Sequence, residues 1–435
     1  MKSLQNALNS YVTNSPSLFR LCQYKDEHGP NSMPLSNWMS INHPSYNMSS
    51  WCFYGTLMND EGVVVADVST MVQQQQGMNS TPYLAEWSLC TDKNSGYVIT
   101  PYMIHSDLVS YAQPFSINIS VPGIPDKLTI ELLQGQTGER GAIYHLRGQD
   151  LAIGTQKLKG TGEYYYDVLL EDVFGTIQAG YGPNSFLPQY LTSEQNDTLQ
   201  SKYDEQMDLY LKNHPDECIG QGSYYYSAPL LKVLSYEIKD LSNNVVLSGK
   251  QGWIWEDYVV QGFTPTILNA LSNDAKWQFY AIQLPEIKAC IMISVVQFNE
   301  SKLNGVTTAA MYSLDSVSKQ AARTPLIQWT SDEVKMEPNC LVPRSATEPK
   351  PDTDSFTLTL TYKEPDDDTR YVTTITGKTT LPNQEIQIDS NEKSVFDKFE
   401  GSYTVSAKIH HPNLQPTPLN TSGIAWAEIN LLNND

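Results

Sequence analysis

The sequence predicts a mostly β protein. Strand-length apolar or alternating runs are separated by turn residues about every ten residues, which is typical of sandwiches and barrels. The composition includes 26 Tyr, 25 Gly and 25 Pro, which favours short strands joined by turns. The chain has 435 residues, too many for one hydrophobic core. We therefore expect two β domains, at residues 16–265 and 270–435.

The first domain is expected to be a meander. Residues 1–35 are polar and interrupted by Pro, which predicts an arm or a loose cover, and residues 72–77 predict a polar loop. Residues 49–58 and 63–68 predict a hairpin. The further strands are predicted at residues 83–89, 96–104, 115–121, 128–133, 142–146 and 164–170.

One helix is predicted, near residues 192–213. Thr192 followed three positions later by Gln195 is a capping box, and an apolar stripe continues to Leu211 before Pro215. The helix belongs to a long insertion at residues 173–220. Long insertions often form lids or pocket walls. A surface helix that only adds stability fits the pattern equally well.

The stretch from Ser223 to Tyr258 combines aromatic residues with acids. It predicts a tyrosine-rich strand, a second strand over 232–239, a turn at Asn243-Asn244 and a strand that contains Trp-Ile-Trp-Glu-Asp-Tyr. Buried Tyr and Trp have large apolar bodies with one polar atom. Acids beside them suggest a pocket for a mostly apolar molecule. The alternative is a pair of core strands whose aromatic rings only pack.

The second domain is predicted to be an antiparallel barrel. A connection rich in Pro and charge is expected at residues 338–353. Period-two alternation in the later runs predicts one face toward a core and one toward solvent. The strands are predicted at residues 277–284, 290–297, 309–314, 356–362, 371–377, 386–389, 403–410 and 424–431.

The charge and the motifs exclude several classes of function. A net charge of −20 opposes binding to nucleic acid or to an anionic membrane surface. No apolar run approaches the roughly 20 residues of a membrane helix. Gly377-Lys378-Thr379 lacks the upstream Gly of a phosphate loop, and neither Gly-x-Ser-x-Gly nor His-Glu-x-x-His occurs. We therefore expect no metal site and no cofactor.

The compartment stays open. Residues 1–11 lack the apolar core of a signal peptide, which favours the cytoplasm unless a signal has been removed. Six cysteines without a Cys-x-x-Cys spacing allow up to three disulfides in a secreted chain, without fixing their pairing. Six sequons are candidates for glycosylation of a secreted protein, at Asn47, Asn79, Asn118, Asn196, Asn299 and Asn420.

Three motifs carry a resemblance. They are Trp51-x-Phe-x-Gly55-x-Leu57, Tyr225-Tyr226-Ser227-x-Pro229-x-Leu231 followed by Gly249-x-x-Gly252-Trp253, and Trp277-x-Phe-x-Ala-Ile-Gln-Leu284. Together they resemble the two-domain lipocalin-like family that contains carotenoid hydratases, AttH-like proteins and fungal Diels–Alderases. The resemblance implies two lipocalin-like β-barrel or β-sandwich domains packed side by side, with the helical insertion in the first.

The family's activities imply the function. Its hydratase-like members carry Trp-x-Asp-His-Glu-Trp, whereas this chain has Trp255 at the position of that Asp, so Glu256 or Asp257 has to supply the acid for hydration. A [4+2] cyclisation needs no proton transfer, and orientation alone contributes up to about 7–11 kcal/mol. We therefore predict a cofactor-independent Diels–Alder or hetero-Diels–Alder cyclase that acts on an apolar polyketide or terpenoid intermediate of secondary metabolism. The alternatives are a hydratase (lyase) acting on an isoprenoid double bond and a carrier without chemistry.

The candidate site residues are expected in an aromatic pocket between the two domains. Because strand residues alternate in direction, we expect about half of them to face elsewhere. The candidate catalytic residues are Glu86, Glu256, Tyr226 and Gln283. The candidate substrate-binding residues are Trp51, Tyr54, Trp87, Tyr102, Trp253, Trp255, Trp277, Tyr280 and Trp329.

Overall fold

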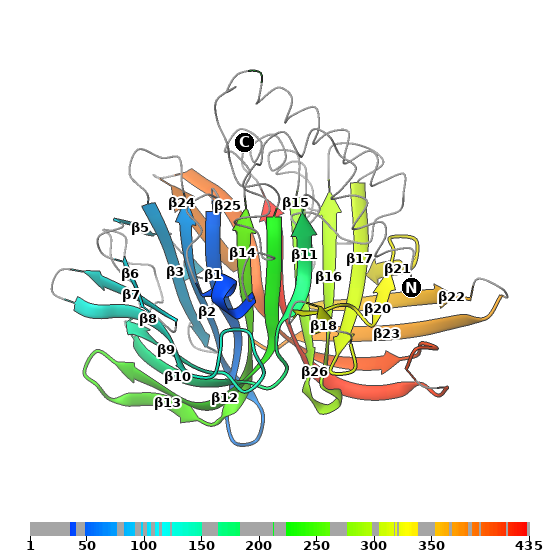
Figure 1. The fold of residues 1–435 in the computed structure, drawn as a ribbon, viewed down its shortest axis with the longest axis horizontal. Helices are drawn as coiled ribbons and strands as arrows, with labels where there is room; N and C mark the ends of the chain where they lie inside the picture. The colour runs from blue at the N-terminus through cyan, green and yellow to red at the C-terminus, as the bar shows by residue number, and fades with distance from the viewer. Residues whose placement is uncertain are drawn as a thin grey trace.

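The fold consists of two curved β-sheets, which meet near the middle of the molecule (Figure 1). The computed structural model describes residues 35–40, 48–75, 82–91, 97–98, 102–105, 109–112, 115–121, 124–149, 164–182, 212, 223–261, 276–297, 304–316, 318–319, 322–337, 353–364, 368–381, 385–390, 393–414 and 416–432. The first sheet forms a half-barrel and the second a nearly closed barrel. This confirms the predicted fold class.

The first sheet is built mostly from residues before 262. The order of its main strands is β5 (Tyr102–His105), β3 (Pro82–Thr91), β2 (Val64–Gln75), β1 (Met48–Met58), β14 (Gln251–Gln261), β12 (Ser223–Asp240), β10 (Tyr164–Asp172), β9 (Ile143–Gln149), β8 (Ile124–Gln134), β7 (Ser116–Val121) and β6 (Val109–Ala112). Four further strands pair with this path or with one another, namely β11 (Ile177–Gly182), β13 (Val245–Gly249), β18 (Ser318–Lys319) and β19 (Ala322–Arg323).

The second sheet is built mostly from residues after 275. The order of its main strands is β20 (Ile327–Trp329), β17 (Asn304–Ser313), β16 (Ala289–Gln297), β15 (Lys276–Leu284), β26 (Leu419–Leu432), β25 (Lys393–Ile409), β23 (Arg370–Thr379), β22 (Ser355–Lys363) and β21 (Val334–Glu337). Two further strands extend it, namely β24 (Glu385–Ser390) and β4 (Tyr97–Val98). A short 3-10 helix, η3 (Pro285–Ile287), joins β15 to β16.

Each sheet receives a short strand from the other half of the chain. Strand β4 pairs in parallel with β24 of the second sheet. Strand β19 pairs in parallel with β11 of the first sheet, where Arg323 lies opposite Ile177. The Arg323 guanidinium lies 5.2 Å from the centre of the Phe174 ring and donates to the Leu314 carbonyl at 2.8 Å. These exchanged strands attach the two sheets to one another.

The central stretch folds differently from its prediction. It was expected to contain two strands before Asn243, but Ser223–Asp240 is one continuous strand, β12. Its register with β14 shifts between Ala228 and Leu231. Pro229 lies in this bulge, where its missing N–H does not interrupt the ladder. The turn at Asn243 is confirmed, since Asn243 has a φ of 65° and leads into β13.

Other boundaries also differ from the predictions. The loop expected at residues 72–77 is wrong for its first part, because β2 continues to Gln75 and pairs with β1 throughout. A short helix, α4 (Leu35–Met39), follows the predicted N-terminal arm. The predicted helix near 192–213 and the predicted domain boundary near 265–270 lie outside the described residues, apart from Lys212. None of the helices in the described ranges is long and apolar enough to span a bilayer.

Side chains of the two sheets form three apolar clusters. One fills the first half-barrel and includes Trp51, Phe53 and Tyr144. Another fills the second barrel and includes Tyr280, Trp329 and Tyr403. The third, which we call the junction cluster, lies where the sheets meet. It consists of Tyr54, Phe174, Ile177, Ala179, Leu230, Trp255, Ala281, Cys290, Met292, Ala310, Tyr312 and Trp426.

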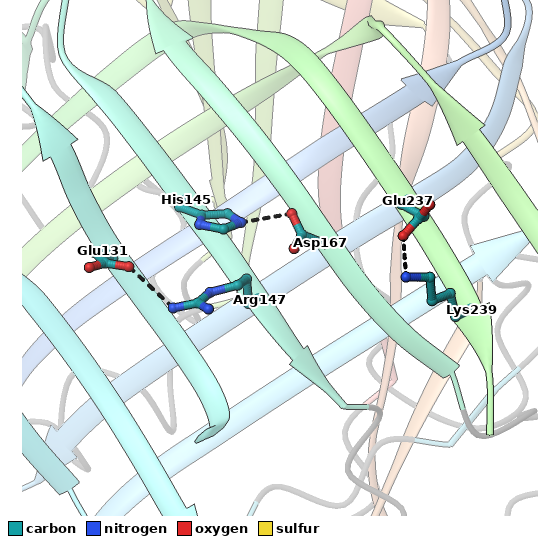
Figure 2. A network of polar contacts seen from close by, with 6 residues as sticks. All are labelled: Glu131, His145, Arg147, Asp167, Glu237 and Lys239. Carbon is teal, nitrogen blue, oxygen red and sulfur yellow. Dashed lines mark hydrogen bonds and ion pairs between the residues drawn. The ribbon is translucent and has the colours of Figure 1, made fainter. Parts of the chain in front are cut away.

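The outer face of the half-barrel carries ion pairs. Figure 2 shows Glu131 with Arg147, His145 with Asp167, and Glu237 with Lys239, spread over β8, β9, β10 and β12. The Arg147–Glu131 pair is 3.2 Å long, with 43% and 36% of the two side chains exposed. Exposed pairs of this kind contribute at most about 1 kcal/mol. The outer face is therefore a solvated surface, and stability depends on the interior.

Glycines allow β1 and β14 to approach closely. A Cβ on Gly252 would lie 2.3 Å from the Thr56 carbonyl oxygen, and a Cβ on Gly55 would lie 2.2 Å from that of Trp253. We expect Gly252→Ala to lower the free energy of unfolding by about 3 kcal/mol or more, since backbone on both strands has to move. Chemical denaturation measures this. The control Ser248→Ala, on exposed β13, should change it by less than about 0.5 kcal/mol; equal effects of the two substitutions would contradict the packing described here.

Candidate functional site

Strand β14 runs between the half-barrel interior and the junction. Its residues alternate between these two environments, so that Ile254, Glu256 and Tyr258 face the interior of the half-barrel. Trp255 belongs to the junction cluster, and Asp257 shares its direction. Two adjacent acids, Glu256 and Asp257, are therefore buried on opposite sides of one strand, with 0% and 5% of their surfaces exposed.

Asp257 is the centre of a hydrogen-bonded cluster at the junction. Its Oδ1 accepts from the Ser227 hydroxyl at 2.6 Å and from the Trp255 indole N–H at 2.6 Å. Its Oδ2 accepts from the Tyr225 hydroxyl at 2.6 Å and from the Tyr54 hydroxyl. We call these five residues the Asp257 cluster. Strand register explains it, because Ser227 lies opposite Asp257, and Tyr54 lies opposite Trp255.

Aromatic rings from both sheets surround the Asp257 cluster. The Tyr54 ring lies 5.5 Å from that of Trp426 in the second sheet. Phe279, also in the second sheet, lies 6.2 Å from Trp255 and 6.3 Å from Tyr225. Tyr225 and Phe279 are only partly buried, whereas Tyr54 and Trp255 are buried. Together these rings form a partly exposed aromatic wall around the Asp257 cluster.

Burial governs the electrostatics of this cluster. It raises the pKa of Asp257, while the hydrogen bonds from Ser227, Tyr225, Tyr54 and Trp255 each act to lower it. Burial, together with the nearby Asp257 charge, raises the pKa of Tyr54 and of Tyr225 well above their usual values. Both phenols therefore keep their protons at physiological pH and donate hydrogen bonds to Asp257. Glu428 of β26 also contributes to the rise at Tyr225.

Glu256, unlike Asp257, is buried without hydrogen bonds to its carboxyl group among the described residues. Phe53 and Ala228 lie beside it on the neighbouring strands. Burial raises its pKa to about 8, and the charges of Asp172 and Asp257 add to the rise. Glu256 is therefore a neutral carboxylic acid near pH 7.

Asp172 lies near Glu256, at the end of β10. Its Oδ1 accepts from the backbone N–H of Phe174 at 2.9 Å and of Gly175 at 2.6 Å. Its Oδ2 is buried and has no hydrogen-bond partner among the described residues. Burial raises the pKa of Asp172 to about 6, although these N–H groups oppose the rise. Tyr144 lies close enough for both acids to raise the pKa of its phenol.

The structure brings only some of the candidate substrate-binding residues together. Tyr54, Trp253 and Trp255 belong to the junction cluster or pack against it. Trp51, like the candidate catalytic residue Tyr226, lies inside the half-barrel. Tyr280 and Trp329 lie inside the second barrel. This distribution follows from the alternation of strand residues and separates the tryptophans into three environments.

Gln283 connects the two sheets. Its amide nitrogen, on β15, donates to the carbonyl oxygens of Pro229 at 2.7 Å and Ile254 at 3.0 Å in the first sheet. The bulge of β12 leaves the Pro229 carbonyl without a partner in the strand ladder. The Gln283 amide supplies the hydrogen bond that this carbonyl lacks. Ser402 also donates its Oγ–H to Asp67 at 2.6 Å across the two sheets, and Tyr312 donates to the Gln178 carbonyl at 2.9 Å.

The remaining candidates lie partly outside the described residues. Glu86 and Trp87 on β3, Tyr102 on β5 and Trp277 on β15 have described backbones only. Among the sequons, Asn420 is exposed on β26 and Asn118 is partly buried on β7, and the others lie outside the described ranges. Cys290 is a buried thiol in the junction cluster. The described part of the chain contains no group of three or more His, Cys, Asp or Glu residues that could hold a metal ion.

The candidate catalytic and substrate-binding residues do not include Tyr225, and Asp257 is named only as a possible acid for hydration. The spacing of Trp255 and Asp257 shows that they share a face, and the same holds for Tyr225 and Ser227. What the sequence lacks is the register between β12 and β14, which places both pairs together. The candidate Tyr226 therefore faces the interior of the half-barrel, whereas its neighbour Tyr225 faces the junction.

The role of Gln283 can be tested by stability. We expect Gln283→Leu to lower the free energy of unfolding by about 2–4 kcal/mol, because two buried carbonyl groups lose their donor. Gln251→Leu is the matched control, since the Gln251 amide donates to one carbonyl, that of Asp60, from an exposed position. It should change the value by less than about 0.5 kcal/mol. Denaturant titration of both variants gives the comparison, and a neutral Gln283→Leu would remove the proposed link.

Glu256 makes stability depend on pH. Its pKa is raised in the folded state, so the folded protein retains a proton that the unfolded chain releases. The contribution of Glu256 to the free energy of unfolding is largest below the pKa of 4.5 that applies to the unfolded chain. It is lost as the pH rises toward 8. Asp172 acts in the same direction, but mainly below pH 6. Between pH 6 and 8, the free energy of unfolding of the wild type should fall by about 2 kcal/mol more than that of Glu256→Gln.

The measurement is the free energy of unfolding at several pH values in an amine-free buffer. Glu237→Gln, a substitution of the same type on the outer face, is the control and should keep the wild-type slope. Parallel curves for wild type and Glu256→Gln would show that Glu256 is not a buried neutral acid.

Comparison with known proteins supports the fold. No family model matches this sequence, and no curated protein matches it. Among solved structures, a Nitrosomonas europaea protein provisionally identified as AttH is similar over 89% of this chain and 94% of its own, with 13% identity and a TM-score of 0.50. Kievitone hydratase from Nectria haematococca aligns over 92% and 93%, with 11% identity and a TM-score of 0.48. CghA with Sch210972 aligns over 90% of both chains, with 10% identity and a TM-score of 0.42. The chain therefore has the two-sheet lipocalin-like fold of the AttH structure, as its sequence motifs predicted.

Proposed function

We propose that this protein is a cofactor-independent enzyme that cyclises an apolar small molecule by a [4+2] cycloaddition at the junction of its two sheets. The observation that carries the proposal is the Asp257 cluster, which fixes an aromatic wall between the sheets. The proposed substrate is a polyketide or terpenoid intermediate of secondary metabolism. The resemblance of the motifs to a family that includes Diels–Alderases agrees with this activity.

The first contribution of such a site is orientation. Hydrogen bonds to one carboxyl group hold Tyr54, Tyr225 and Trp255 in fixed positions. Phe279 and Trp426 add rings from the second sheet. A flexible chain that folds against a rigid apolar wall loses conformational freedom on binding, before the bonds form. Placing the diene and the alkene in contact in this way accelerates the reaction without any proton transfer.

The second contribution is electrostatic. Asp257 and Glu428 lie near the wall, and the Tyr225 and Tyr54 hydroxyls direct their protons toward Asp257. The faces of the aromatic rings are also electron-rich. Such surroundings favour a guest with an electron-poor conjugated system, such as an enone that reacts as a heterodiene. We therefore favour a hetero-Diels–Alder reaction of an unsaturated carbonyl compound.

A hydration reaction is the second candidate. Asp257 stands where the hydratase-like members of the family have Glu, and its carboxyl group faces the junction. Burial raises its pKa, and hydration requires its protonated form to donate a proton to an alkene carbon. Glu256 is less suited to this role, because it faces the half-barrel interior on the other side of β14.

The test uses linear trienones, in which a conjugated diene and an enone are joined by tethers of increasing length. We expect the protein to accelerate cyclisation and to favour one stereoisomer, with no change in mass. Asp257→Asn and Tyr225→Phe should each reduce the rate roughly ten-fold or more, because the wall loses its fixed geometry. Asp167→Asn, on the outer face, is the control and should leave the rate unchanged.

Chiral chromatography and mass spectrometry separate the outcomes. A product heavier by one water, with solvent deuterium on carbon, would support hydration and contradict the cyclase. Tight binding of every probe without any product would indicate a carrier. Equal rates for wild type and Asp257→Asn would exclude the Asp257 cluster as the site.

A further inference from the structure

Three buried carboxyl oxygens inside the half-barrel have no hydrogen-bond partner among the described residues. They are both oxygens of Glu256 and Oδ2 of Asp172. Both side chains are fully buried, with 0% exposure. A buried acceptor without a donor lowers stability, and it does so more strongly when it is charged. Three such atoms in one region point to a guest that supplies donors.

Four donors nearby already have acceptors. The N–H groups of Phe174 and Gly175 donate to the other oxygen of Asp172. The N–H of Gly138 donates to the Tyr144 hydroxyl oxygen at 2.7 Å. The Thr176 hydroxyl donates to the Gly138 carbonyl at 2.6 Å. These four donors are therefore not available to the three carboxyl oxygens that lack partners.

The charges that act on Glu256 are negative. They come from Asp172 and Asp257, both of which are acids. Arg323 and Arg140 act on Asp172, but neither is among the groups that shift Glu256. Aromatic rings complete the surroundings, since Phe53 lies opposite Glu256 on β1 and its ring is 6.1 Å from that of Tyr144. Carboxyl groups and aromatic faces together favour a cation.

We propose that the interior of the half-barrel binds a small organic ammonium ion, with Glu256 and Asp172 as its hydrogen-bond acceptors. A primary ammonium group carries three N–H donors, which matches the three unpartnered oxygens, and its charge offsets the carboxylates. Its alkyl part packs against apolar side chains such as Phe53. Binding replaces the proton that Glu256 otherwise holds, so one ammonium ion enters as one proton leaves.

This site is distinct from the proposed cyclisation site. Glu256 and Asp257 are adjacent on β14 but face opposite sides of the sheet. A ligand at Glu256 therefore contacts the half-barrel interior and not the aromatic wall of the junction. Loss of one site leaves the other testable, because the trienone assay does not involve Glu256.

The experiment is calorimetric titration of the full chain with n-butylammonium chloride near neutral pH, in two amine-free buffers that differ in ionisation enthalpy. We expect saturable binding of one equivalent with release of about one proton, as follows from replacement of the Glu256 proton. Glu256→Gln should weaken binding roughly ten-fold or more, because it removes the anionic acceptor. Asp167→Asn, on the outer face of the half-barrel, is the control and should bind as wild type does.

Neutral n-butanol is the matched probe, and it should bind at least ten-fold more weakly than the ammonium ion, roughly as expected for loss of a buried ion pair. If Glu256→Gln fails to fold, Asp172→Asn tests the same prediction. The proposal is overturned if wild type does not bind the ammonium ion, if butanol binds equally well, or if Glu256→Gln binds unchanged. Loss of binding in Asp257→Asn but not in Glu256→Gln would also overturn it, by placing the cation at the junction.

Discussion

The alternation of side chains along β14 is the constraint on which the rest of the structure depends. Neighbouring residues of a strand point to opposite faces, and β14 separates the interior of the half-barrel from the junction with the second sheet. One residue step therefore moves a side chain from one environment to the other. Trp255 and Asp257 help to build the junction, whereas Glu256 is enclosed with Asp172 and Tyr144.

The burial of the two adjacent acids, Asp257 and Glu256, is compensated in two different ways. Asp257 is compensated by four donors from three strands, so its burial also orders the side chains that supply them. Glu256 is compensated by protonation, which removes its charge but leaves both oxygens without partners among the described residues. The first arrangement suits a rigid wall for shaping a substrate. The second costs stability, and natural proteins retain such groups mainly where they serve a function.

Most of the fold could be predicted, and part of the site could not. The period-two runs predicted most strands, because alternation is a local property of the chain. The continuity of β12 could not be predicted, since the bulge that accommodates Pro229 depends on pairing with β14. The tryptophans look alike in sequence, yet Trp51, Trp255 and Trp329 lie in three separate clusters. Their placement is set by strand order and register, which join residues hundreds of positions apart.

The most direct test of this account is a carboxyl ¹³C NMR titration of the intact protein, with the Glu256 signal identified by its absence in Glu256→Gln. Because the two faces of β14 differ, Glu256 should titrate near pH 8, far above an exposed Glu. A Glu256 signal that titrates near the ordinary value of 4.5 would show that its side chain is solvated. That result would contradict the division of β14 into two faces, on which both proposed sites depend.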